Sequence, residues 1–104
     1  MMTLGALLDR VDELGEDSTI YARRPWTCES EAFATSENDV DLVELARTGV
    51  AYLLEVSIAR EVIDVWRSWR AGSSPTSLDR CKAVIHYALH DAYLPADGTP
   101  RTGN

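Results

Sequence analysis

The chain has little cysteine. Only two of its 104 residues are cysteines, Cys28 and Cys81, and neither belongs to a CxxC pair or to a cluster with histidine. This number is too small for a disulfide-rich secreted scaffold, and the spacing gives neither a zinc motif nor a redox motif. We therefore expect two reduced thiols, with Cys81 in the core.

Targeting and catalytic signals are also absent from the sequence. The apolar stretch near the start has no basic region and is interrupted at Asp9, so no signal peptide is expected. No apolar stretch reaches the length of a membrane span. The glycines form no phosphate-binding loop, and no serine lies in a G-x-S-x-G context. These features predict a cytoplasmic protein that is not an enzyme and needs no cofactor and no membrane.

Positive charge is scarce in the first part of the chain. Residues 1–44 contain eleven acidic and three basic residues, a net charge of −8, whereas residues 45–104 contain six acidic and seven basic residues. An acidic surface repels nucleic acids and anionic membranes, so direct binding of nucleic acid is not expected. The asymmetry favours a basic protein as the partner.

Apolar residues, by contrast, are abundant enough for one core. Hydrophobic residues make up 45% of the chain, and its length is that of one domain. We expect a single globular domain over residues 1–95, followed by a flexible polar tail over residues 96–104. The sequence gives no indication of the oligomeric state.

The local patterns predict an α+β fold. Apolar residues recur at helical spacing over residues 4–14, and residues 19–24 form a β-branched and aromatic strand that ends at Pro25. Residues 31–35 are the candidate partner of this strand in a short β-hairpin. Residues 39–47 are ambiguous, with a short helix favoured and a strand as the alternative.

Two long helices are predicted in the second half. Over residues 50–70 the apolar side chains cover about two thirds of a helical wheel, which predicts a long central helix with Val62 and Trp66 in the main core. Thr76 and Asp79 form a capping box for a C-terminal helix over residues 77–91. The short loop packs this helix antiparallel on the central one. The side chains that it is expected to bury are Leu78, Cys81, Ile85, Ala88, Leu89 and Ala92.

Glu55 is the unusual residue of the predicted central helix, because it falls inside the apolar arc. A buried carboxylate needs a cation or hydrogen-bond donors, and Arg23 and Arg24 are candidate partners. We therefore expect Glu55 to be a buried polar residue shielded from water. The alternative is a general base with a raised pKa, but a lone glutamate does not define a reaction.

His86 and His90 are four residues apart, a spacing that can hold a metal on one helical face. No glutamate follows His86, and Lys82 shares the same face. We expect two solvated histidines and no bound metal.

Acidic residues gather where the first predicted helix ends. Acids at a helix C-terminus oppose the helix dipole and cost about 0.3–1 kcal/mol each, so local stability does not explain them. Trp26 lies in a loop and is either a lid on the core or an anchor for a partner. The predicted partner-binding residues are Asp9, Asp12, Glu13, Glu16 and Asp17, with Glu29 and Glu31 as a second group, and Trp26.

Three segments of the chain carry a resemblance to a protein family. They are Tyr-Leu-Leu-Glu-Val-Ser-Ile-Ala-Arg-Glu-Val-Ile-Asp-Val-Trp (Tyr52 to Trp66), Cys-Lys-Ala-Val-Ile-His-Tyr-Ala-Leu-His-Asp-Ala-Tyr-Leu-Pro (Cys81 to Pro95), and Pro25-Trp26 after a strand. Together they resemble a family of short, functionally unassigned bacterial proteins of the toxin-immunity type. These are packing motifs, so the resemblance implies a shared fold and brings no catalytic residues.

The leading functional hypothesis is a small acidic binding module, an immunity-type inhibitor that neutralises a basic toxin, such as a nuclease, by occlusion. Charge complementarity would steer the two proteins together. The alternative is an acidic nucleic-acid mimic or adaptor that acts on a basic host or phage protein. A third hypothesis is a small enzyme that uses Glu55.

Overall fold

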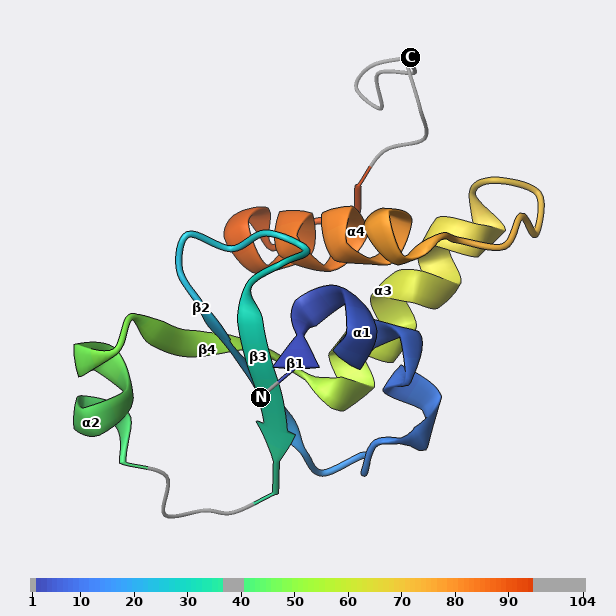
Figure 1. The fold of residues 1–104 in the computed structure, drawn as a ribbon. Coiled ribbons are helices and arrows are strands. Elements are labelled where there is room, and N and C mark those ends of the chain that lie inside the picture. Colours follow the sequence, from blue (N-terminus) through green and yellow to red (C-terminus); the bar gives the residue numbers. More distant parts are fainter. Residues whose placement is uncertain (1, 37–40, 95–104) are drawn as a thin grey trace.

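The computed structural model describes residues 2–36 and 41–94 and has an α+β fold, as predicted (Figure 1). Residues 37–40 and the predicted tail 96–104 lie outside the described residues. In chain order the elements are β1 (Met2–Thr3), α1 (Leu4–Asp9), the 3-10 helix η1 (Val11–Glu13), β2 (Thr19–Arg23), β3 (Glu31–Thr35), α2 (Leu42–Arg47), β4 (Val50–Glu55), α3 (Val56–Ser68) and α4 (Ser77–His90).

The sheet has four antiparallel strands in the order β1-β3-β2-β4. The predicted hairpin is confirmed, since β2 and β3 pair with Ile20 opposite Ala34 and Ala22 opposite Ala32. These small and β-branched side chains point to the face that packs against the helices, and α1, α3 and α4 all contribute to the same core. The domain therefore consists of the sheet and of a layer formed by α1, α3 and α4, which pack on one of its faces (Figure 1).

Residues 50–70 are not one continuous helix, so that prediction is wrong. Residues Val50–Glu55 form β4, which pairs with β2, and the helix α3 begins only at Val56. The register shifts within this pair, because Leu54 lies opposite Ile20 and Tyr52 lies opposite Tyr21. Leu53 is the extra residue of this β-bulge, which lets two consecutive leucines be buried and hides the alternation typical of a strand.

Because β4 takes the place of the start of the predicted helix, two further residues differ from their predicted positions. Glu55 ends β4 and stands at the N-cap of α3, where its side chain is exposed and makes no capping hydrogen bond. The prediction that Glu55 is buried is therefore wrong. Val62 is buried in the core as predicted, whereas Trp66 is half-buried and packs at the edge of the core.

Helix α4 and its capping box are confirmed, but its buried face differs from the predicted one. The Thr76 hydroxyl accepts a hydrogen bond from the Asp79 backbone, and the Asp79 carboxylate accepts one from the Thr76 backbone. α4 packs on α1 and α3 through a face that includes Ala83 and Val84. Of the predicted residues only Cys81 is fully buried. Ile85 and Ala88 are half-buried, and Leu78, Leu89 and Ala92 are exposed.

The ambiguous segment contains a short helix, which confirms the favoured reading for Leu42–Arg47. The Asp41 carboxylate caps this helix by accepting a hydrogen bond from the backbone N–H of Glu44 at 3.1 Å. None of the described helices combines the length and the apolar character that crossing a bilayer requires.

Candidate partner-binding surfaces

Four of the predicted acidic residues gather between α1 and β2. Asp12 and Glu13 belong to η1, and Glu16 and Asp17 follow in the turn that leads into β2. All four are exposed, and the Asp12 side chain is 96% accessible. Glu13 makes an exposed ion pair with Arg10 at 3.3 Å, a contact worth little in water. We call these four residues the acidic turn.

Arg60 of α3 holds the acidic turn in place. Its Nε donates a hydrogen bond to the carbonyl of Val11 at 3.1 Å, and its Nη2 donates to the carbonyls of Asp12 and Leu14. The carbonyls of Asp12 and Leu14 lie where η1 ends, and the carbonyl of Val11 also accepts a hydrogen bond from the N–H of Leu14 at 3.3 Å. The positive charge of Arg60 thus offsets the negative end of the η1 dipole, so Glu16 and Asp17, which follow η1, are tolerated there. Arg60 is far away in the sequence, which is why no local pattern revealed this contact.

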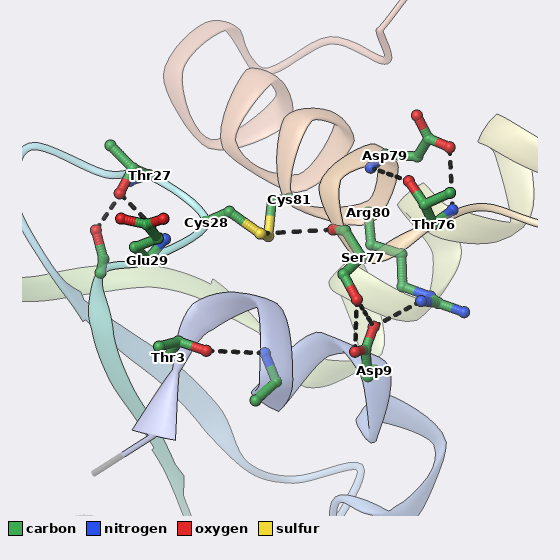
Figure 2. Close-up of a disulfide and its surroundings, with 12 residues drawn as sticks. Thr3, Asp9, Thr27, Cys28, Glu29, Thr76, Ser77, Asp79, Arg80 and Cys81 are labelled. Carbon is green, nitrogen blue, oxygen red and sulfur yellow. Dashed lines mark hydrogen bonds and ion pairs between the residues drawn. A yellow bond between two sulfur atoms is a disulfide. The ribbon is translucent and has the colours of Figure 1, made fainter.

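Asp9 has a different role from its acidic neighbours. Its carboxylate accepts a hydrogen bond from the Ser77 hydroxyl and pairs with Arg80 at 2.7 Å (Figure 2). Ser77 and Arg80 belong to α4, so Asp9 connects α1 to α4. The structure therefore places Asp9 in an intramolecular contact that a partner would have to compete with.

The structure does not bring the second group together with the acidic turn. Glu29 and Glu31 lie at the far end of the β2–β3 hairpin, separated from Asp17 by the length of β2, roughly 17 Å for five residues. Glu29 is exposed, and Glu31 pairs with Arg23 at 2.7 Å. Glu29 and Glu31 therefore form a group that is separate from the acidic turn.

Trp26 also lies at that far end, in the β2–β3 loop. It is half-buried, and its Nε1 donates a hydrogen bond to the carbonyl of Ala22 at 3.0 Å. The guanidinium of Arg24 lies 4.7 Å from the centre of its ring. Trp26 is therefore held in one position at a surface separate from the acidic turn.

Glu55 joins the acidic turn, which the sequence did not indicate. It pairs with Thr19 across β2 and β4, and the next residue, Val56, donates its N–H to the carbonyl of Ser18 at 2.9 Å. The backbone of Glu55 thus lies beside the end of the turn that carries Glu16 and Asp17, and its side chain is exposed. We call the acidic turn together with Glu55 the acidic surface.

The two cysteines form a disulfide, so the prediction of two reduced thiols is wrong. Cys28 in the β2–β3 loop is joined to Cys81 in α4, with Cα atoms 5.3 Å apart and a separation of 53 positions in the sequence (Figure 2). The loop is also tied to α1, because the N–H of Gly5 donates to the carbonyl of Cys28 at 2.9 Å. Gly5 allows this approach, since a Cβ there would lie 2.7 Å from the Cys28 sulfur. Three elements therefore meet at the disulfide.

The two histidines of α4 lie side by side, with ring centres 4.6 Å apart. His90 is exposed, but His86 is half-buried, which differs from the expected pair of solvated side chains. Burial, followed by the neighbouring His90, lowers the pKa of His86 from its ordinary value. Across residues 2–36 and 41–94 no group of three or more histidine, cysteine or acidic side chains is arranged to hold a metal ion.

Comparison with protein-family models, with curated proteins and with solved structures finds no match to this chain. The resemblance to toxin-immunity proteins therefore stays a prediction.

Proposed function

We propose that this protein is a binding module that inhibits a basic protein by covering its surface, as an immunity protein neutralises a toxin. The observation that carries the proposal is the acidic surface, in which Asp12, Glu13, Glu16, Asp17 and Glu55 are all exposed near one end of β2. Five exposed carboxylates near one end of β2 attract a positively charged partner and repel nucleic acids.

The acidic surface is also held in a defined shape. Arg60 fixes the backbone of the turn through hydrogen bonds to three carbonyls, and the turn continues directly into β2. A surface that is already ordered loses less conformational freedom when a partner binds, so more of the charge attraction remains as affinity. A nuclease toxin fits this surface, since an enzyme that binds phosphates presents positive charge.

A binding function is favoured over catalysis by the position of Glu55. The enzyme hypothesis needs this carboxylate in a protected site near a second reactive group. Glu55 is exposed instead and belongs to the acidic surface. We therefore propose that the protein is not an enzyme and acts without a cofactor.

The cytoplasmic location, which follows from the lack of targeting and membrane-spanning segments in the sequence, stays a prediction. The bond between Cys28 and Cys81 is an argument against it. Disulfides form and persist mainly in oxidising compartments. A partner met outside the cytoplasm is equally consistent with the proposed inhibition.

The test begins with an affinity pull-down from the native host at low and high salt, followed by binding kinetics with the captured protein. Changing Asp12, Glu13, Glu16 and Asp17 to lysine should slow association strongly and leave the fold intact, because these side chains lie outside the core. High salt should reduce the difference between variant and wild type, since the Debye length near physiological ionic strength is only about 8 Å.

A matched control separates a local effect from net charge. The pair Glu16→Lys and Asp17→Lys changes the charge as much as the pair Glu44→Lys and Asp91→Lys, whose side chains are also exposed but lie elsewhere. Only the first pair should slow association. An on-rate that is unchanged, or that falls equally in both pairs, would show that the acidic surface is not the binding site. If the captured partner is a nucleic-acid-binding host or phage protein, the protein is a mimic rather than an immunity protein.

A further inference from the structure

A groove of about 460 Å³ runs along α4 beside the β2–β3 loop. Its apolar wall on α4 includes Leu78, Ile85 and Leu89, and Trp26 faces them from the loop. Leu78 and Leu89 are 52% and 62% exposed, although both are large aliphatic side chains. Contiguous apolar side chains that stay open to solvent mark an interaction site more often than a random surface.

The groove is preformed in the absence of a ligand. The Cys28–Cys81 disulfide contributes to its lining and fixes the distance between the loop and α4. On the loop side, the hydrogen bond from Trp26 to the carbonyl of Ala22 fixes the indole. Both walls are therefore held by contacts within the chain, which lowers the entropy cost of binding.

The charge of the groove is opposite to that of the protein. The chain contains 17 acidic and 10 basic residues, yet the ionisable residues that line the groove are Lys82, His86 and His90, without a carboxylate. Arg24 adds a further cation on the ring of Trp26. A ligand that combines apolar and acidic groups therefore fits the groove, whereas a basic ligand does not.

The spacing along α4 indicates the shape of the ligand. Leu78, Ile85 and Leu89, together with Lys82, are separated by intervals of four, three and four residues, the repeat by which one helix packs against another. The stripe covers eleven residue steps, roughly 16 Å along the helix axis. A second helix of about three turns can lie along it.

We propose that this groove binds an amphipathic helix of another protein, whose apolar stripe is flanked by aspartate and glutamate. The apolar stripe would pack on Leu78, Ile85 and Leu89, and the flanking acids would meet Lys82 and the histidines. This site is separate from the acidic surface, because the β2–β3 loop and the acidic turn lie at opposite ends of β2. The proposal therefore does not depend on the proposed inhibitory function.

The charges also argue against other occupants. In an antiparallel pair of two α4 helices that pack through this stripe, Lys82 of one copy would lie within about one helical turn of Lys82 of the other, so two like charges would meet. Residues 95–104 of the chain itself contain no large apolar side chain to fill the groove. An acidic helix from a different protein meets both requirements.

The probes are two synthetic helical peptides of about three heptads, with leucine at positions a and d. One carries glutamate at positions e and g and the other carries lysine there, so each repels a second copy of itself. Binding to the oxidised full chain is followed by fluorescence anisotropy of the labelled peptide. The acidic peptide should bind at least about tenfold more tightly than the basic one. Lys82→Glu should reverse this preference.

The exposed leucines allow the site to be tested without unfolding the protein. Leu78→Gln and Leu89→Gln should each weaken binding of the acidic peptide, whereas Val43→Gln, an equally drastic change at a 74% exposed position on α2, should not. The proposal is overturned by an acidic peptide that does not bind, by equal affinity for the two peptides, or by affinity that is unchanged in Leu89→Gln. It is also overturned if sedimentation shows a dimer that Leu89→Gln dissociates, because a second copy would then be the occupant.

Discussion

Reduction of the Cys28–Cys81 disulfide is expected to remove a large part of the stability of the domain. The bond joins residues 53 positions apart, and both backbones are also held by other contacts in the folded state. Its main effect therefore falls on the unfolded chain, which loses conformational freedom when a long loop is closed. Reduction restores that freedom and leaves most of the folded contacts in place.

The size of the effect follows from the loop length. For a loop of 53 residues, the chain-entropy relation gives about 4 kcal/mol at 25 °C. Domains of this size are stable by roughly 5–15 kcal/mol. A loss of this size therefore lowers the urea concentration at the unfolding midpoint markedly.

The assay is urea unfolding of the same preparation with and without a phosphine reductant, followed by tryptophan fluorescence. Reduction should lower the free energy of unfolding by about 4 kcal/mol and raise the m-value, because a chain without a cross-link exposes more surface when it unfolds. The control is the double variant Cys28→Ala/Cys81→Ala, in which the reductant should change nothing. Mass spectrometry after alkylation reports the thiol state directly.

Two results would refute this reasoning. If protein purified without reductant carries two alkylatable thiols, the cysteines are not paired and the expectation of two reduced thiols is correct. If the thiols are paired but reduction leaves the free energy of unfolding unchanged, the bond does not constrain the unfolded chain.

Three further predictions concern the core, a close contact and pH. Leu8→Ala, at a fully buried position, should lower the free energy of unfolding by about 2–5 kcal/mol, whereas Leu89→Ala should change it by less than about 0.5 kcal/mol in the same urea titration. Gly5→Ala should cost about 1–3 kcal/mol because its methyl group would meet the Cys28 sulfur, and a double-mutant cycle should show a smaller cost in the cysteine-free background. The pKa of His86 is lowered below 6.5 by burial and by His90, so the folded state binds fewer protons than the unfolded state below that pH. The contribution of His86 to stability should thus be fully present above pH 6.5 and be lost as the pH falls through the lower folded pKa, an effect that His86→Gln should abolish and that NMR titration can assign.

Some features of this protein can be predicted from the sequence because they are determined by residues that are close together in the chain. The β2–β3 hairpin, the capping box of α4 and the burial of Val62 depend on patterns within a few residues of the chain. The α+β class follows from such elements. The acidic surface was also partly visible, because its first four residues are close in sequence.

Only the tertiary structure decided the features that depend on partners distant in the chain. Residues 50–55 have apolar side chains that suit a helix, but β2 offers them a strand to pair with, and the bulge at Leu53 hides the alternation of a strand. That pairing also exposes Glu55 and places it beside the acidic turn. Cys28 meets Cys81, and Arg60 meets the carbonyls of Val11 and Leu14, only because folding brings together segments about 50 residues apart. The local periodicity of the sequence does not depend on such contacts. The pattern of residues around each position is the same whether or not a distant partner is present.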